Sequence, residues 1–336
     1  MDPVVVAAII AAGVSMLTLV GSLLVQVYGI RRAARDTDRS IARQLADQSE
    51  QLDRTLAEQR EQLERTLAEQ REQLERTLAE QRERTLNERF ATAANGLGSD
   101  KPAVRLAGVY AMAGLADDWE VNRQTCVDVL CAYLRMPYDP DPGEGASAES
   151  RLEFGANQQV RRTVIRVLSA HLRATARISW RGLDFDFTGV HFDVGDFSSA
   201  LFSGGTVSFL DAQFSGGEVY FDDAQFVGSE VYFSHALFSA GTVSFLRTRF
   251  SGGLVSFDDA QFVGSTVSFR EALFSGGTVY FDGAQFSDGE VDFSSVSDWS
   301  HPPIFDFTGA PPPALTLPEL PIARSRAVAE TAGDEA

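Results

Sequence analysis

A phenylalanine repeat decides the fold of the C-terminal half of the chain. Residues 214–237 read FSGGEVYFDDAQFVGSEVYFSHAL and residues 250–273 read FSGGLVSFDDAQFVGSTVSFREAL, so the two stretches nearly repeat each other. From Phe202 to Phe293, phenylalanine recurs at alternating spacings of seven and five, a composite period of twelve. Valine or alanine usually stands two positions before each phenylalanine, so both side chains point the same way from an extended backbone. The pattern predicts two inward ridges of apolar side chains.

These repeats are expected to stack. A single repeat cannot bury its phenylalanines, whereas stacked repeats form a continuous ladder, so the pattern predicts a solenoid. Glycine-containing turns at 203–205 and 227–229 provide the backbone freedom needed at its corners. One coil, meaning one full turn of the solenoid, could hold 12 or 24 residues. We expect 24, because four sides of five, seven, five and seven residues leave room for the rings. The array should then make about five coils, with ~4.8 Å between stacked strands.

Just before this array, phenylalanine recurs every five residues, with a small or β-branched residue two places earlier. The residues concerned are Phe187, Phe192, Phe197 and Phe202, with Val190, Gly195 and Ala200 preceding the last three. This stretch resembles the pentapeptide-repeat family, which implies a right-handed four-sided β-helix; the seven-residue face departs from the family's uniform five. The whole chain is similar to membrane-anchored pentapeptide-repeat proteins of actinobacteria, and 28 arginines against one lysine agree with a GC-rich genome.

The N-terminal segment predicts a membrane anchor. From Val4 to Ile30 no residue is charged, and the run is long enough to cross a hydrocarbon core of ~30 Å as a helix. Arg31, Arg32 and Arg35 follow at once, which by the positive-inside rule places the C-terminal bulk in the cytoplasm and the N-terminus outside. A cleaved signal would carry its positive charge before the apolar run. We therefore expect an uncleaved, single-pass anchor in the cell membrane.

An eleven-residue repeat follows the anchor. QLDRTLAEQRE at 51–61 recurs as QLERTLAEQRE at 62–72 and at 73–83. Its leucines alternate spacings of four and seven, and at 100° per residue they drift only about 20° per repeat, forming one nearly straight stripe. The stripe consists of Leu52, Leu56, Leu63, Leu67, Leu74 and Leu78. Such a stripe needs a partner helix, so we expect a homo-oligomeric hendecad coiled coil, either dimer or trimer.

These signals predict an α+β multidomain protein with five regions. They are a transmembrane anchor at 1–30, a coiled-coil rod at 31–90, a helical domain at 91–180, a β-helix resembling pentapeptide repeats at 181–310, and a disordered proline-rich tail at 311–336. Phe305 and Phe307 are expected to close the last coil.

Three helices are expected in the helical domain. One should open at Pro102, and the others should cover about Val121 to Arg135 and Val160 to Arg173. The acidic, proline- and glycine-rich segment 137–150 is expected to form an exposed loop. No motif within these residues predicts a role for this domain.

No catalytic chemistry is predicted. The four histidines are scattered, while Cys126 and Cys131 diverge too far on one helix for a metal pair and are expected as buried, reduced core residues. The chain contains no GxxxxGK[ST] loop and no nucleophile elbow, and GGTVSF lacks the aspartate of calcium-binding GGxGxD repeats. We expect no enzyme activity, no catalytic residue, no cofactor and no metal.

Negative charge is the functional signal. The net charge is -18, and residues 181–310 carry 18 acidic residues against four arginines, a surface that repels nucleic acid. The candidate partner-binding acidic face consists of Asp211, Glu218, Asp222, Asp223, Glu230, Asp258, Asp259 and Asp282.

Two functions are compatible with this charge. The preferred one is a membrane-tethered, non-catalytic interaction scaffold that presents the acidic β-helix to an unidentified cytoplasmic or membrane-associated protein. The alternative is a DNA-mimicking modulator of a type II topoisomerase, which the resemblance implies because some pentapeptide-repeat proteins occupy the enzyme's DNA site with an acidic β-helix. The membrane tether argues against the alternative.

Overall fold

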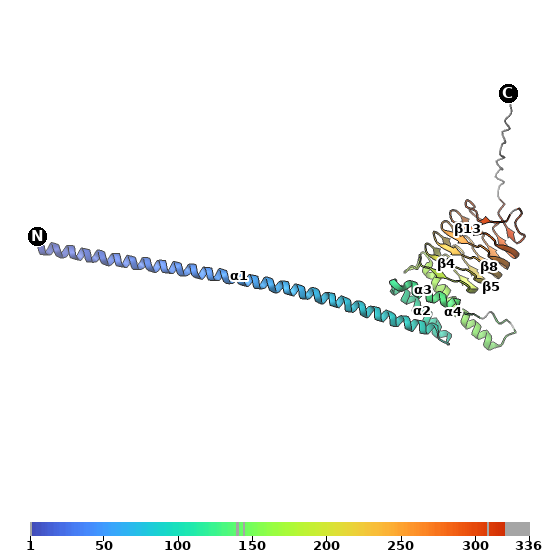
Figure 1. Cartoon of the computed structure of the whole chain (residues 1–336), viewed down its shortest axis with the longest axis horizontal. Coiled ribbons are helices and arrows are strands. Elements are labelled where there is room, and N and C mark those ends of the chain that lie inside the picture. The colour runs from blue at the N-terminus through green and yellow to red at the C-terminus, as the bar shows by residue number, and fades with distance from the viewer. Residues whose placement is uncertain (1, 139–140, 144, 308, 320–336) are drawn as a thin grey trace, which may run out of the picture. The chain divides into compact units, whose positions relative to one another are not determined.

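A computed structural model describes residues 2–138, 141–143, 145–307 and 309–319 (Figure 1). The chain divides into two compact units, Met1–Arg82 and Glu83–Ala336. The division falls where the eleven-residue repeat ends, at Glu83. As predicted, the architecture is α+β, with helices preceding a parallel β-solenoid of about five turns.

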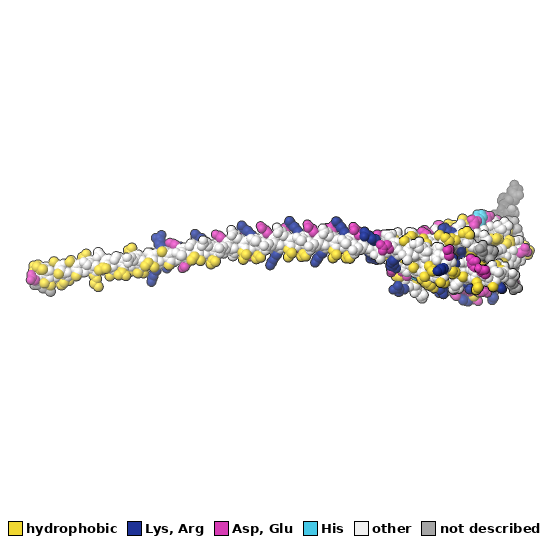
Figure 2. Space-filling view, turned by 90° about the horizontal axis from the view of Figure 1, so that it is seen from below, with side chains coloured by type: hydrophobic (Ala, Val, Ile, Leu, Met, Phe, Trp, Pro, Cys, Tyr) yellow, Lys and Arg dark blue, Asp and Glu magenta, His cyan; other side chains and the backbone are white. Residues whose placement is uncertain are grey.

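The first unit is a single helix. Helix α1 runs over Pro3–Leu97 and continues into the second unit. Arg54, Arg65 and Arg76 each pair with the glutamate four residues earlier, an order that supports an isolated helix. In the charged part of α1, Figure 2 shows hydrophobic side chains gathered along one side and most charged ones along the other. Among the described helices, α1 alone has an apolar window long enough to cross a membrane.

Three helices and one 3-10 turn form the helical part of the second unit. They are α2 (Pro102–Asp118), η1 (Glu120–Asn122), α3 (Arg123–Arg135) and α4 (Ala148–Leu172). Helix α2 opens at Pro102, as predicted. Helix α4 begins at Ala148, well before the expected Val160, because the Ser147 hydroxyl accepts a hydrogen bond from the Ser150 N–H at 3.1 Å and caps the helix. The loop predicted at 137–150 therefore ends at Ser147.

The described residues of the solenoid form sixteen strands in three parallel sheets. The first sheet contains β1 (Phe185–Asp186), β4 (Thr206–Ser208), β7 (Glu230–Tyr232), β10 (Leu254–Ser256), β13 (Thr278–Phe281) and β15 (Ile304–Phe305). The second sheet contains β2 (His191–Asp196), β5 (Gln213–Tyr220), β8 (Leu237–Ser244), β11 (Gln261–Ser268), β14 (Gln285–Asp292) and β16 (Leu315–Thr316). The third sheet contains β3 (Leu201–Phe202), β6 (Gln225–Phe226), β9 (Arg249–Phe250) and β12 (Leu273–Phe274).

The pairing register confirms a coil of 24 residues and excludes one of twelve. Phe214 pairs with Phe238, 24 residues further on, and their rings stack with centroids 4.7 Å apart. Phe209 and Phe233 stack in the same way at 4.6 Å and 1°. The first coil is shorter by two residues, since Phe192 pairs with Phe214. Ring-on-ring contact along each column adds to burial, so the phenylalanine ladder is the core of the solenoid.

The far end of the solenoid is closed by the proline-rich segment. Phe305 stacks on Phe281 at 4.9 Å and Phe307 contacts Phe305 at 5.4 Å, which agrees with the predicted closure. The prediction that the chain leaves the solenoid at 310 is wrong, because β16 pairs with β14 and Leu315 is buried. Ala314 and Leu317 also pack against the core, and the Val291 and Phe293 N–H groups donate to the Ala314 and Thr316 carbonyls, so this part of the segment belongs to the last coil. Residues 320–336 of the predicted tail lie outside the described residues.

Candidate functional site: two corners and the α4 groove

Every twelfth residue of the array adopts a left-handed backbone conformation. Within the described residues, the non-glycine residues with positive φ are Ser199, Asp211, Asp223, His235, Arg247, Asp259 and Glu271, all between 53° and 60°. Each is the third residue of a four-residue turn, such as the one closed by the Ala212 N–H donating to the Phe209 carbonyl at 3.1 Å. Aspartate tolerates this conformation better than most residues. Three of the eight candidate acids, Asp211, Asp223 and Asp259, therefore stand where the left-handed backbone of the turn favours aspartate.

These turns form two columns that we call corner A and corner B. Corner A lies between the first and second sheets and consists of the turns that follow Phe209, Phe233, Phe257 and Phe281. Corner B lies between the second and third sheets and consists of the turns that follow Phe197, Phe221, Phe245 and Phe269.

The eight candidate acids do not share one face. Asp211, Asp258, Asp259 and Asp282 lie at corner A, Asp222 and Asp223 at corner B, Glu218 on β5 and Glu230 at the start of β7. The two nearly identical sequence stretches begin at Phe214 and Phe250, 36 residues apart, which is one and a half coils of 24 residues. Equivalent aspartate pairs in the sequence are thus carried to different corners. The prediction of a single acidic face is therefore wrong, because the eight acids lie at two corners and on two strands.

The two corners differ in how their charge is balanced. At corner B, Arg247 donates two hydrogen bonds to Asp223, at 2.8 and 2.9 Å, and this hydrogen bonding lowers the pKa of the Asp223 carboxyl. Arg270 belongs to the same corner. No arginine or lysine stands in the four turns of corner A, where His235 is the one basic side chain. Corner A is consequently the more acidic of the two.

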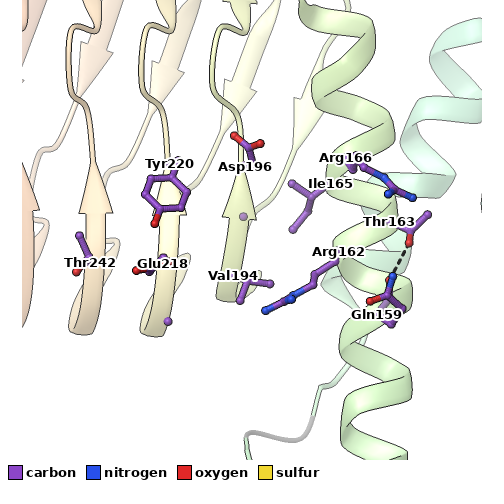
Figure 3. Close-up of a pocket in the computed structure, with 12 residues that line it drawn as sticks. Gln159, Arg162, Thr163, Ile165, Arg166, Val194, Asp196, Glu218, Tyr220 and Thr242 are labelled. Carbon is purple, nitrogen blue, oxygen red and sulfur yellow. Dashed lines mark hydrogen bonds between the residues drawn. The ribbon is translucent and has the colours of Figure 1, made fainter.

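A groove lies between helix α4 and the outer side of the second sheet (Figure 3). Its volume is about 800 Å³. Helix α4 contributes Gln159, Arg162, Thr163, Ile165 and Arg166 to the groove. The strands β2, β5 and β8 contribute Val194, Gly195, Asp196, Gly217, Glu218, Tyr220 and Thr242. We refer to this feature as the α4 groove.

The two walls of the α4 groove carry opposite charges. Figure 3 shows Arg162 extending from α4 toward the strands, whereas Arg166 turns away and donates to the Tyr110 hydroxyl at 2.5 Å. Arg162 is exposed and makes no ion pair within the described part of the chain. On the strand wall Glu218 is exposed, while Asp196 lies 3.6 Å from Arg173. Among the described residues, the groove thus offers a guanidinium without an ion pair and two exposed carboxylates, of which Asp196 is paired with Arg173.

A buried polar cluster holds α4 against the first coil. Arg161, only 5% exposed, donates to a backbone carbonyl of α3 at 2.7 Å and to the His191 carbonyl at 2.9 Å. Asp193 accepts hydrogen bonds from the Tyr138 hydroxyl at 2.8 Å and from Gln158 at 2.7 Å. Burial, together with the bond to Asp193, raises the pKa of Tyr138. Arg161 thereby pairs one backbone carbonyl on the open edge of β2, the last strand of its sheet.

The side chains of the α4 groove suit binding rather than bond making. None of its lining residues is serine, cysteine or histidine, and the buried Thr163 hydroxyl donates to the Gln159 carbonyl at 2.8 Å. Cys126 and Cys131 are free and buried in α3, as predicted. Within the described ranges, no group of three or more histidine, cysteine or acidic side chains is placed to hold a metal ion.

Of the residues that line the α4 groove, Glu218 alone was among the predicted site residues. Arg161 and Arg162 were both expected on one helix, but the sequence did not predict that Arg161 is buried and Arg162 exposed. A consecutive arginine pair inside an apolar helix was the available signal. The strand wall comes from residues 30 or more positions further along the chain, such as Val194 and Glu218, and no local pattern links them to α4.

Comparison of the chain with protein-family models, curated proteins and solved structures finds no match. The class of the C-terminal half therefore rests on geometry: it is a parallel β-solenoid of about five turns with stacked phenylalanines, the architecture of pentapeptide-repeat proteins.

Proposed function

We propose that the chain is a membrane-tethered, non-catalytic interaction scaffold whose acidic β-solenoid binds a protein partner in the cytoplasm. The α4 groove is the observation that carries the proposal. It is an open channel of about 800 Å³ with a free arginine on one wall and an exposed glutamate on the other. A protein segment with both acidic and basic side chains would complement these walls, and complementary charges favour specific docking.

Rigidity of the groove supports the proposal. Its strand wall is part of a ladder whose phenylalanine rings stack every coil, and its helix wall is held by the buried Arg161. A surface that is already ordered loses little conformational entropy when a partner binds. The solenoid adds an acidic surface around the groove, with 18 acidic residues against four arginines over 181–310.

The N-terminal part of α1 supports the tether. Its apolar window is long enough to cross a bilayer, and Arg31, Arg32 and Arg35 follow on the side that the positive-inside rule assigns to the cytoplasm. The leucine stripe of α1 supports assembly into an oligomer, which would present several solenoids at once and raise the apparent affinity for a multivalent partner. Membrane anchoring, together with 28 arginines against one lysine, supports the proposal that the chain is of the same type as the membrane-anchored pentapeptide-repeat proteins of actinobacteria.

The test is crosslinking of the full-length protein in its native cell, followed by membrane solubilisation and mass spectrometry of the captured proteins. Arg162→Glu and Glu218→Arg each give the groove walls the same charge and are expected to lower capture of the partner at least fivefold. Glu290→Arg is the matched control, because Glu290 stands in the same outward column as Glu218, three coils away. Equal capture by all three variants would contradict binding at the groove.

The second candidate is the DNA-mimicking modulator of a type II topoisomerase. The excess of negative charge on the solenoid favours it, and corner A has no arginine or lysine among its turns. The distribution of the other acids over corner B and two strands weighs against a single DNA-like face. Purified full-length protein that leaves topoisomerase supercoiling unchanged at micromolar concentration would remove this candidate.

A further inference from the structure

The apolar stripe of α1 does not begin at the eleven-residue repeats. Stepping back from Leu52 by eleven residues reaches Ile41, Ile30 and Leu19, and stepping back from Leu56 reaches Leu45, Ala34 and Leu23. All of these residues are apolar, and the spacings of four and seven continue without a break. The stripe therefore runs in one phase from Leu19, inside the uncharged segment, to Leu78 in the rod.

This continuity requires one uninterrupted helix, and α1 supplies it. The helix extends over Pro3–Leu97, so residues eleven apart stay within about 20° of each other around its axis. A separate anchor helix joined to the rod by a loop would lose this phase relation. The uncharged segment shares no motif with the repeats and is apolar at most positions, so it is the continuous helix that assigns Leu19, Leu23 and Ile30 to the stripe.

A polar position accompanies the stripe in each eleven-residue period. Gln59 lies three residues after Leu56, and steps of eleven toward the N-terminus reach Gln48, Thr37 and Gln26. Gln26 is inside the uncharged segment, about 20° around the helix from Leu19. Five residues separate it from Arg31, about 7.5 Å along the axis, so it lies toward the cytoplasmic side of the span.

Gln26 differs from the other polar residues of the span. The hydroxyls of Ser15, Thr18 and Ser22 donate to backbone carbonyls of their own helix at 2.8 to 3.1 Å. The side-chain amide of Gln26 makes no hydrogen bond in the described part of α1. A polar side chain facing lipid without a partner is unfavourable, and glutamine hydrogen-bonds across helices in membranes. A second copy of the same helix would bring such a partner.

Charge on the rod does not oppose association of two copies. Residues 31–90 carry 13 arginines and 14 acidic residues, so the net charge of this part is close to zero. Arg54, Arg65 and Arg76 are paired with glutamates of the same helix, away from the stripe. Two copies anchored in one bilayer with the same topology must also run parallel, with equivalent residues at the same depth.

We propose that copies of this chain associate in parallel and in register along one continuous stripe from Leu19 to Leu78, with Gln26 hydrogen-bonded to its counterpart in the other copy. The inference rests on the proposed membrane tether and adds to it the identity of one partner, a second copy of the chain. Association then begins inside the bilayer and continues without a change of phase into the rod.

Variants of the full-length protein with one added cysteine, in native membranes, test this arrangement by oxidative crosslinking. Leu19→Cys, Leu23→Cys and Ile30→Cys lie on the stripe, whereas Leu17→Cys and Leu24→Cys lie 140° to 160° away from Leu19, at about 100° per residue. We expect at least fivefold more crosslinked dimer from the stripe positions. The native Cys126 and Cys131 are buried and stay in place, and the unsubstituted chain gives the background.

Three outcomes would overturn the inference. Crosslinking that is equal around the helix, crosslinking with a period of seven, or crosslinking at Leu56→Cys in the rod without any at Leu19→Cys or Leu23→Cys would each do so. Gln26→Leu is expected to lower the Leu23→Cys crosslink several-fold and Gln26→Asn to restore most of it. An unchanged yield in Gln26→Leu would remove the hydrogen bond from the arrangement.

Extraction with alkaline carbonate separates failure of the inference from failure of the tether. A chain that stays in the membrane pellet but crosslinks only in the rod retains its tether and contradicts the continuous stripe. A chain that is released by carbonate contradicts the tether itself, whatever the pattern of crosslinks, and with it the shared depth on which the register depends.

Discussion

The phenylalanine array of the solenoid and the leucine stripe of α1 both place an apolar residue at fixed spacing, yet they bury it to opposite extents. Phe245 is fully buried, whereas Leu67 is 45% exposed and Leu63 is 60% exposed. A coil of 24 residues closes on itself, and the next coil of the same chain covers it. The stripe of a helix faces one direction, where its own chain provides no cover. One repeat is completed within the molecule, whereas the other leaves its stripe exposed, and we propose that a second copy covers it.

Truncating one core ring is expected to give the largest effect. Phe245 stacks between Phe221 at 4.9 Å and Phe269 at 4.7 Å, so Phe245→Ala leaves a cavity within the ladder. The free energy of unfolding of the second unit should fall by ~3–5 kcal/mol. Urea unfolding of the full-length protein, followed by the fluorescence of its tryptophans, measures this change. An effect below ~1 kcal/mol would mean that the ladder relaxes around the cavity, contrary to a close-packed core.

The corresponding truncation in the rod should act differently. Leu67→Ala removes apolar surface that a single copy leaves exposed, so the unfolding free energy of the second unit should change by less than ~0.5 kcal/mol. Self-association should weaken by about tenfold or more, because a buried leucine contributes ~1.5–3 kcal/mol. Crosslinking yield against protein density in membranes measures association. Loss of solenoid stability in this variant would break the distinction between the two repeats.

Glycines at the turns of the solenoid allow the backbones of neighbouring coils to approach closely, a contact that the single helix of the first unit does not have within its described residues. Gly253 has a φ of 76°, and a Cβ there would overlap the Ser229 carbonyl oxygen of the previous coil. Gly253→Ala should cost at least ~1–2 kcal/mol, the penalty for an L-residue in this conformation. At Gly216 a Cβ would meet nothing within 4 Å, so Gly216→Ala is the matched control. Equal unfolding midpoints for the two variants would contradict close backbone stacking at this turn.

Buried thiols in α3 predict a pH dependence confined to the second unit. Burial raises the pKa of Cys126 from an ordinary value of 9.0 to about 11. Between these values the unfolded thiol has ionised while the folded one keeps its proton, so the stability that it contributes is complete below pH 9 and is lost as the pH rises toward 11. Cys126→Ala should reduce this loss. Rapid alkylation of the native thiols at pH 8.5 would contradict their burial.

The surface ion pair at corner B should give the smallest effect. Asp223 and Arg247 are each 48% exposed, and a double-mutant cycle with alanine should yield a coupling of ~0.2–1 kcal/mol. Because hydrogen bonding from Arg247 lowers the pKa of Asp223, this contribution is present above the ordinary carboxyl pKa and is lost as the pH falls through the lowered value. A coupling that stays constant down to pH 2 would exclude a role for the Asp223 charge.

Local patterns were sufficient for the repeat but not for the corners. The spacing of phenylalanines along the chain predicts which side chains point inward, because alternation in an extended backbone is a local property. Which outward residues lie side by side depends on the number of residues per coil. Asp222 and Asp258 occupy equivalent places in the sequence and lie at different corners, because 36 residues make one and a half coils.

The start of α4 and the end of the solenoid were predicted incorrectly for a related reason. Ser147 caps α4 within a segment whose prolines and glycines indicate a loop, and residues 315–316 pair with β14 within a segment whose composition indicates disorder. In both cases a few specific hydrogen bonds outweigh composition. The α4 groove is further from local prediction, since its walls are joined by contacts between residues distant along the chain, such as Arg161 with the His191 carbonyl and Gln158 with Asp193.

By itself the sequence determined the solenoid, the twelve-residue period of its phenylalanines, the helical repeat and the apolar N-terminal segment, because each depends on the spacing of side chains along the chain. The pairing register decided between coils of 12 and 24 residues. Tertiary structure alone decided which acids are neighbours, that Arg162 faces Glu218 across a groove, and that Leu315 belongs to the last coil. Those relations join residues that are distant along the chain, and they form only when packed elements bring backbone and side-chain groups within hydrogen-bonding or van der Waals distance.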